Sequence, residues 1–232
     1  MIIFWLPIAI GVMLGTLSGG HISRLAQLHL RHIWLLLGAT LVQIALVFAS
    51  PVLPERGIDP LRVSLPLTTA AVGLFVVLNR QLPGMPLVLV GLVANLAVIV
   101  ANGGLMPVSP EVLTAAGKAG TLDYAREHPG IRLPKSKNVL LEWEETRLAW
   151  LSDAVLSPPL GPIDRRWNVS AGDLIIAAGL AYLTAEVVRR PTGPTRPATP
   201  ATPAKPTERK EHVHGATDAG SHTVSSRAIS RW

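Results

Sequence analysis

The sequence places one acidic residue, Asp173, at the start of an apolar segment, where a carboxylate could bind a ligand, a proton or an ion. Ionisable groups inside apolar membrane segments are rare and are usually functional. Ser170 stands three residues earlier, which is the spacing of a capping box, in which the serine and the acid satisfy each other's backbone amides at the start of a helix. Asp173 is therefore predicted as a helix cap or as a functional acid, and the two roles can coexist.

A second candidate is the turn Asn102-Gly103-Gly104, which ends an apolar run and is followed by Leu105-Met106-Pro107. Glycine just beyond a helix adopts the left-handed conformation that caps the last carbonyls. One glycine suffices for that cap, whereas two glycines permit a tight turn whose backbone groups point into a cavity. The pattern lacks the lysine and the preceding strand of a phosphate-binding loop. A helix cap and a cavity wall both stay open as interpretations.

Thr146 and Asp153 lie in the polar segment between these motifs. With them, the candidate ligand-binding residues are Asn102, Gly103, Gly104, Met106, Pro107, Thr146, Asp153 and Asp173. The sequence holds no paired-carboxylate motif, nucleophile elbow or zinc-binding helix pattern. Because cysteine is absent, disulfides, thiolate catalysis and thiolate metal sites are excluded. We expect no cofactor and no metal, and the catalytic residues of any enzyme activity are unknown.

Five apolar segments must position these residues, and they cover residues 2–17, 33–49, 61–78, 86–101 and 169–188. Each has about 16 to 20 residues, close to the ~20 that cross a bilayer as a helix. Only 16% of the chain is charged, against roughly 25% in soluble domains. The predicted fold is all-α, an integral membrane bundle with four transmembrane helices in residues 1–101 and a fifth in residues 169–188. Four or six spans are the alternatives.

The first segment carries three glycines spaced four apart, at Gly11, Gly15 and Gly19. They form a flat ridge that lets another helix approach closely, which a cleaved signal peptide would not need. The last segment has its own row of small residues at Ala177, Ala181 and Ala185. We therefore expect the first helix to pack against the fifth. Gln43 and Asn95 are expected to form hydrogen bonds between helices, because an amide in lipid needs a partner.

Positive residues in the loops set the orientation, since cytoplasmic loops carry an excess of Lys and Arg. The first and third loops and the end of the last segment hold five, namely Arg24, Arg31, Arg80, Arg189 and Arg190; the second loop holds two, Arg56 and Arg62. This difference places the first loop, the third loop and the tail in the cytoplasm. The N-terminus and residues 102–168 then lie outside.

The extracytoplasmic segment 102–168 is predicted to contain helices. Ser109-Pro110-Glu111 is typical of a helix start, with a short helix to Gly117 and another short turn from Thr121. Farther on, apolar residues recur at helical spacing, at Leu140, Trp143, Leu148, Leu151 and Val155. This spacing predicts an amphipathic helix of about four turns. That helix would be a lid on the bundle, an interfacial helix with Trp143 and Trp150 at headgroup depth, or a wall of a site.

Residues 189–232 are rich in Pro and Thr and hold eight of the 21 Lys and Arg residues but three of the 15 acids. Such a segment cannot bury enough apolar surface to offset its ordering entropy, so it is predicted to be a disordered, basic, cytoplasmic tail. It would act as a solubilising tail or lie near anionic lipid headgroups. Because the excess charge lies in the tail, no folded basic face and no nucleic-acid partner is expected.

Three motifs in series resemble a bacterial family of multi-spanning membrane proteins known as domain of unknown function 5317. They are the segments Asn102 to Ser109, Thr146 to Asp153 and Ser170 to Asp173. The positions that match the family pattern are Asn102, Gly103, Met106, Pro107, Thr146, Leu148, Asp153, Gly172 and Asp173. The resemblance covers about residues 1–188 and leaves the tail out. It implies a multi-pass protein of the bacterial cell membrane and assigns no activity.

In the predicted topology all three motifs lie on the outer face, where they could converge on one pocket. We expect that pocket to bind a small or lipid-like molecule, in a binding or accessory protein whose partners are membrane lipids and, as a further option, another membrane protein. The alternative is a membrane enzyme acting on a lipid-linked substrate, with Asp153 and Asp173 as acid and base. A transporter is less favoured, because five spans do not divide into equal repeats and no mid-span charge marks a path.

Overall fold

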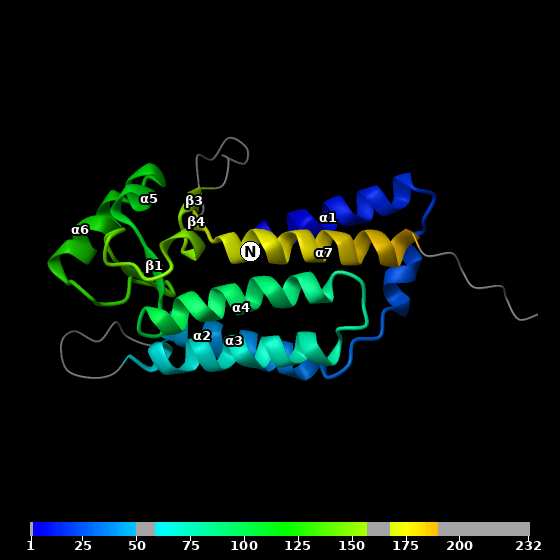
Figure 1. Ribbon diagram of the computed structural model, residues 1–232, viewed down its shortest axis with the longest axis horizontal. Coiled ribbons are helices and arrows are strands. Elements are labelled where there is room, and N and C mark those ends of the chain that lie inside the picture. Colours follow the sequence, from blue (N-terminus) through cyan, green and yellow to red (C-terminus); the bar gives the residue numbers. More distant parts are fainter. Residues whose placement is uncertain (1, 50–58, 157–167, 190–232) are drawn as a thin grey trace, which may run out of the picture. The chain divides into compact units, whose positions relative to one another are not determined.

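The computed structural model describes residues 2–49, 59–156 and 168–189. Five apolar helices run alongside one another (Figure 1): α1 (Ile2–Leu17), α2 (Ile33–Ala49), α3 (Pro60–Leu78), α4 (Met85–Ala101) and α7 (Ala171–Arg189). Their bounds agree with the five predicted segments to within two residues. The predicted tail lies outside the described residues, apart from Arg189.

Two of these helices, α3 and α7, are long and apolar enough to cross a membrane, with 19 residues each. The helices α1, α2 and α4 are also apolar but have only 16 or 17 residues. At about 1.5 Å per residue, the five helices extend roughly 24 to 29 Å, against about 30 Å for the hydrocarbon core of a bilayer.

Helix α1 packs along α7 in the same direction, through the predicted glycine ridge. A Cβ on Gly11 would lie 2.3 Å from the Ala181 carbonyl oxygen, and one on Gly15 would lie 2.6 Å from Cβ of Val188. Small residues therefore let these two backbones approach closely, as expected for helices packed in lipid. Gly19 takes no part, since a Cβ added there would have no atom within 4 Å, and Gly20 approaches Val188 instead.

Helix α4 packs antiparallel to α7 on another face, again through glycines. A Cβ on Gly84 would lie 2.2 Å from the Gly179 carbonyl oxygen, and one on Gly91 would lie 2.5 Å from that of Gly172. Helix α7 is consequently in close contact with both α1 and α4. The second helix pair, α2 and α3, is joined by a hydrogen bond from Gln43 Nε2 to Thr68 Oγ1 (2.8 Å), as the sequence predicted for this amide.

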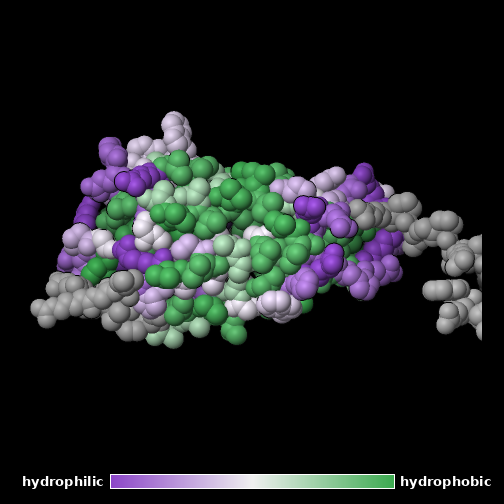
Figure 2. Space-filling model, turned by 60° about the horizontal axis from the view of Figure 1, so that its bottom comes forward, coloured by the Kyte–Doolittle hydropathy of each residue, from purple (hydrophilic) through white to green (hydrophobic). Residues whose placement is uncertain are grey.

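The outward faces of the helices carry large apolar side chains. Those more than 60% exposed include Trp5, Leu37, Leu41, Phe48, Leu67 and Val100. Figure 2 shows apolar residues gathered over the middle of one face, with hydrophilic residues toward its two ends. A bundle with this surface exposes to its surroundings the kind of side chain that soluble proteins bury.

A small mixed cap follows α4, at the end where α1, α3 and α7 begin (Figure 1). It contains the helices α5 (Pro110–Ala115) and α6 (Ala119–Glu127), the strands β1 (Met106–Val108), β2 (Asn138–Leu140), β3 (Val155–Leu156) and β4 (Asn168–Val169), and a 3-10 turn, η2 (Ala149–Leu151). A second 3-10 turn, η1 (Ile22–Gln27), lies in the first loop. The all-α prediction holds for the bundle and is wrong for the cap.

The strands form two separate pairs. Strand β1 pairs with β2 in parallel, with Met106 opposite Asn138 and Val108 opposite Leu140. Strand β3 pairs with β4 antiparallel, with Val155 opposite Val169. Helix α5 begins as predicted, since the Ser109 hydroxyl accepts a hydrogen bond from the Val112 amide. Helix α6 begins at Ala119, two residues before the predicted start at Thr121.

The predicted amphipathic helix in residues 138–156 is wrong. The segment begins as β2, continues through turns to η2 and ends as β3. The apolar residues of this segment do not share one helical face. Val139 is buried where β1, α3 and α4 meet, while its neighbour Leu140 packs on the core of the cap. Leu148 adopts a left-handed backbone, with φ of 56°, which no helix of L-residues continues.

The run Leu105-Met106-Pro107 joins the cap to the bundle. Leu105 and Met106 are fully buried against Leu61 and Leu65 of α3 and Val98 of α4. The abrupt end of the apolar segment therefore marks the point where the chain leaves α4 and closes over the end of the bundle.

Candidate functional site

Asp173 forms the predicted capping box at the start of α7. Its amide donates to the Ser170 hydroxyl (2.9 Å), and its Oδ2 accepts from the Ser170 amide (3.4 Å). Its other oxygen, Oδ1, accepts from Asn95 Nδ2 of α4 (2.8 Å), and the Ser170 hydroxyl donates to Asn95 Oδ1 (2.9 Å). The carboxylate is thus a helix cap that also ties α7 to α4, and Asn95 is the interhelical amide that the sequence predicted.

Asn102 ends α4 and fixes the loop that carries η2. Its Nδ2 donates to the Arg147 carbonyl (2.8 Å), and its Oδ1 accepts from the Arg147 amide (3.0 Å). Asn79 ends α3 in the same way and binds both backbone groups of Arg31 (2.8 and 2.9 Å). At each of these two helix ends, therefore, an asparagine fastens a distant loop through a pair of backbone hydrogen bonds.

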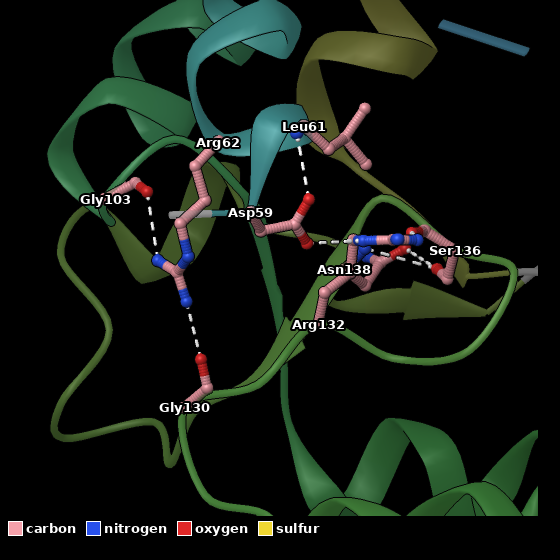
Figure 3. A network of polar contacts seen from close by, with 8 residues as sticks. All are labelled: Asp59, Leu61, Arg62, Gly103, Gly130, Arg132, Ser136 and Asn138. Atoms are coloured by element: carbon pink, nitrogen blue, oxygen red, sulfur yellow. Dashed lines mark hydrogen bonds and ion pairs between the residues drawn. The ribbon is translucent and has the colours of Figure 1, made fainter. Parts of the chain in front are cut away.

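The two glycines after Asn102 are required for the approach of α3. Gly103 and Gly104 both have a left-handed backbone, with φ of 75° and 88°, as the sequence predicted. A Cβ on Gly104 would lie 1.9 Å from the Arg62 carbonyl oxygen. The Arg62 guanidinium in turn donates to the carbonyls of Gly103 (3.1 Å) and Gly130 (2.5 Å) (Figure 3).

A buried ion pair holds the cap to α3 beside this turn (Figure 3). Arg132 Nε lies 2.6 Å from Asp59 Oδ2, and the Arg132 side chain is fully buried. The other oxygen of Asp59 accepts from the Leu61 amide (2.9 Å) and caps α3. Arg132 Nη1 also donates to the Ser136 carbonyl (3.1 Å). The start of α3 and the loop between α6 and β2 are therefore fixed to each other.

Asp153 is the centre of a second polar network, inside the cap. Its side chain is buried, and its Oδ2 accepts from Asn138 Nδ2 (2.7 Å) and from Asn168 Nδ2 (2.9 Å). Its other oxygen, Oδ1, is buried without a hydrogen-bond partner among the described residues. Burial raises the pKa of Asp153, while the Lys137 charge and the two amides act in the opposite direction.

The network continues from the two amides to a serine and a lysine. The Ser136 hydroxyl donates to Asn138 Oδ1 (2.7 Å), and Lys118 Nζ donates to Asn168 Oδ1 (3.0 Å). The carboxylate of Asp153 accepts from the side-chain NH2 groups of Asn138 and Asn168. It thereby fixes the orientation of both amides, so that their oxygens face Ser136 and Lys118. Burial lowers the pKa of Lys118, and the Asp153 charge opposes that shift.

Lys137 interacts electrostatically with both carboxylates that the sequence singled out, Asp153 and Asp173. Burial disfavours its charge, but the carboxylates of Asp153 and then Asp173 outweigh that effect and raise the pKa of Lys137. Asp153 and Asp173 nevertheless belong to separate hydrogen-bond networks, one in the cap and one at the start of α7.

A cavity of about 230 Å³ adjoins the Asp153 network. Its walls come from α5, α6, β1, β2, β4 and the loop before β2, and they are formed by Val108, Leu113, Lys118, Thr121, Leu133, Pro134, Lys135, Ser136, Asn138 and Asn168. Four of these residues, Lys118, Ser136, Asn138 and Asn168, belong to the hydrogen-bond network around Asp153. The cavity is therefore a polar pocket with an apolar side.

The eight sequence-predicted residues do not line this cavity. Met106 and Pro107 are fully buried in the core, and the Thr146 hydroxyl donates to the Glu142 carbonyl of its own turn (2.8 Å). Asn102, Gly103, Gly104 and Asp173 hold elements together, as described above. Only Asp153 reaches the cavity wall, through its bonds to Asn138 and Asn168.

Sequence reasoning missed the residues that do line it, chiefly Lys118, Lys135, Ser136, Asn138 and Asn168. None of them belongs to a recognisable motif, and they come from segments separated by up to 50 residues. A polar residue in a long loop has no periodicity that would single it out. Among the residues that the structure describes, no group of three or more His, Cys, Asp or Glu side chains could hold a metal ion.

The fold and site define a class: a bundle of apolar helices, with a mixed cap that contains a buried polar network and a small cavity. The chain belongs to the family of unknown function DUF5317, whose sequence profile matches residues 27–185, well over half of the chain. No curated protein and no solved structure matches it.

Proposed function

We propose that this protein is a multi-pass integral membrane protein with five spans, whose extracytoplasmic cap binds a small ligand in the cavity beside Asp153. The observation that carries the proposal is the cavity, because its polar wall is built from three separate segments and a buried carboxylate binds the amides of two of them. Polar groups that converge on a concave site beside apolar side chains are a feature of ligand pockets.

Five spans are supported by the surface and the lengths of the helices. Large apolar side chains are exposed on α1, α2, α3 and α4 as well as on α7. The three shorter helices fit a bilayer if they tilt little and the bilayer thins locally around them. The end of the bundle opposite the cap carries Arg24, Arg31, Arg80 and Arg189, which favours the cytoplasm for that end and the outside for the cap.

Two tryptophans support an interfacial position for the cap. Trp150 is 83% exposed and Trp143 is 45% exposed, and their rings lie edge to face with centroids 6.5 Å apart. Trp150 lies within η2, which packs against α4 and α7, and Trp143 precedes it in the same loop. Tryptophan is enriched at headgroup depth, and exposed rings beside two helix ends fit that layer.

Binding is favoured over catalysis by the position of Asp153. Its side chain is only 2% exposed, so that it would orient the residues of the wall without reaching a ligand itself. A general acid or base must come within hydrogen-bond reach of the proton that it transfers. The enzyme alternative would therefore require the cap to open.

Native mass spectrometry of the full chain in mild detergent tests ligand binding. We expect a bound mass in the wild type that is absent from Thr121→Trp, which fills the cavity from α6, and is retained in Arg126→Gln, an exposed position of the same helix outside the cavity. An adduct kept by Thr121→Trp, or no adduct in the wild type, would contradict the proposal.

Cysteine labelling tests the orientation. Because the chain has no cysteine, Glu127→Cys reports on the cap and Gln81→Cys on the opposite end. An impermeant maleimide added to intact cells should label Glu127→Cys only, and both should react after lysis. Labelling of Gln81→Cys alone would invert the orientation.

A further inference from the structure

The charges around the cavity indicate what kind of ligand it takes. Two lysines, Lys118 and Lys135, are among the described residues that line it, and none of those residues is acidic. Lys118 is half-buried, and its hydrogen-bond partner is the neutral oxygen of Asn168. Neither lysine forms an ion pair within the described part of the chain. A half-buried cation beside an open cavity favours an anionic occupant, because burial strengthens such a pair.

The nearby carboxyl group of Asp153 does not cancel this preference. It is buried behind the wall and directs its Oδ2 at the amides of Asn138 and Asn168 rather than at the cavity. Lys137 also interacts electrostatically with this carboxyl group. The lining of the pocket therefore contains two lysines and no acid, and the nearby carboxyl group of Asp153, whose pKa burial raises, lies behind the wall.

The remaining walls set the size and polarity of the occupant. Val108, Leu113 and Leu133 form an apolar side, and each is almost fully buried. The Ser136 and Thr121 hydroxyls add hydrogen-bonding groups. At about 30 Å³ per water-sized group, the cavity of about 230 Å³ holds a molecule of roughly eight non-hydrogen atoms.

We infer that the cavity binds a small organic oxyanion, with its phosphate or carboxylate group at Lys118 and Lys135 and its apolar part against Val108, Leu113 and Leu133. This inference rests on the proposed function, since it names the ligand class of the same cavity. The group could belong to a soluble molecule or to a lipid headgroup, and the two sources share this chemistry.

Isothermal titration calorimetry on the full chain in neutral detergent tests the inference with paired probes. Butyl phosphate and hexanoate are compared with uncharged butanol, and dihexanoyl phosphatidic acid with uncharged dihexanoylglycerol. We expect the anions to bind at least tenfold more tightly than their uncharged partners. Tighter binding of phosphatidic acid than of butyl phosphate would identify the lipid headgroup as the source, and the reverse would identify a soluble ligand.

Variants assign the binding to the two lysines. Lys118→Met should weaken binding of the anions at least tenfold, Lys135→Gln several-fold, and Lys118→Arg much less than Lys118→Met, because it keeps the charge. Arg126→Gln removes a cation of the same cap outside the cavity and should change affinity less than twofold. Thermal unfolding of each variant checks that the cap remains folded.

Equal affinity for charged and uncharged probes, or equal affinity of Lys118→Met and the wild type, would overturn the oxyanion class. If Thr121→Trp still abolished binding of the uncharged probes, the ligand-binding function would stand while the anion inference failed. If no probe bound at all, the inference would fail, and the copurified mass in the native spectrum would decide the proposed function separately.

Discussion

The substitution Gly104→Ala is expected to destabilise the protein by roughly 2 to 5 kcal/mol. A non-glycine residue in the left-handed region costs about 1–2 kcal/mol, and Gly104 has φ of 88°. The added Cβ would lie 1.9 Å from the Arg62 carbonyl oxygen and 2.7 Å from its carbonyl carbon. Overpacking of this kind costs a further 1–3 kcal/mol or so, because the clash involves backbone rather than the end of a flexible side chain.

The neighbouring backbone has little freedom to relieve that clash. Arg62 is held by its bonds to the carbonyls of Gly103 and Gly130, and Asp59, three residues earlier, is held by the buried Arg132. A shift of the start of α3 would therefore strain several contacts at once.

Two glycines of the cap provide matched controls. Gly117 also has a left-handed backbone, with φ of 70°, but a Cβ added there would have no atom within 4 Å, so Gly117→Ala should cost only the conformational part, about 1–2 kcal/mol. Gly120 lies in α6 with free space around it, and Gly120→Ala should stabilise by about 0.5–1 kcal/mol.

The assay is equilibrium unfolding in detergent, followed by circular dichroism, for the wild type and the three variants. The expected order of stability is Gly120→Ala, wild type, Gly117→Ala, Gly104→Ala. If Gly104→Ala were no less stable than Gly117→Ala, the close approach of the turn to α3 would be refuted. If Gly104→Ala lost the bound ligand while its stability was unchanged, Gly104 would instead be a ligand-binding residue.

Three further predictions concern the bundle, the junction and the pH dependence. Gly15→Ala should weaken the packing of α1 on α7 and lower the unfolding temperature, since its Cβ would lie 2.6 Å from Cβ of Val188. The control is Gly38→Ala, whose Cβ would meet no atom within 4 Å and which should leave the unfolding temperature unchanged or raise it. Arg132→Met should cost roughly 3 kcal/mol or more in chemical unfolding, because it leaves the Asp59 carboxylate without its buried partner. Burial raises the pKa of Asp153, so the folded state binds this proton more tightly than the unfolded chain does. The contribution of Asp153 to stability should therefore fall as the pH rises from about 4 through the folded pKa. The measurement is the difference in free energy of unfolding between the wild type and Asp153→Asn as a function of pH. A difference that does not change with pH would contradict the raised pKa.

The helices of the bundle could be predicted from sequence because their causes are local. An apolar run of the right length needs its backbone hydrogen bonds satisfied within itself, and that requirement sets the element before any partner is known. The capping box of Ser170 and Asp173 spans only four residues. The glycine spacing at Gly11 and Gly15 likewise marks the face of α1 that packs on α7. It also included Gly19, which lies outside that interface.

The segment from Asn138 to Leu156 shows where periodicity fails. Its apolar residues suit a helix equally well, but Val139 is held by pairing with β1, and the Arg147 backbone is held by Asn102. Both partners lie more than 30 residues earlier in the chain. Tertiary contacts overrode the local pattern here, since a strand pair and a side-chain clamp satisfied the backbone groups that a helix would have paired internally.

The sequence by itself determined the extent of the five apolar helices and the capping of α7, and it singled out the motif residues as candidates. Only the tertiary structure decided what those residues do. The turn at Gly103 and Gly104 makes room for α3, and Asp153 orients Asn138 and Asn168 around a cavity that none of the motifs marks. The physical reason is that a binding wall depends on side chains from segments far apart in the chain, and their hydrogen bonds exist only once packing has brought those segments together.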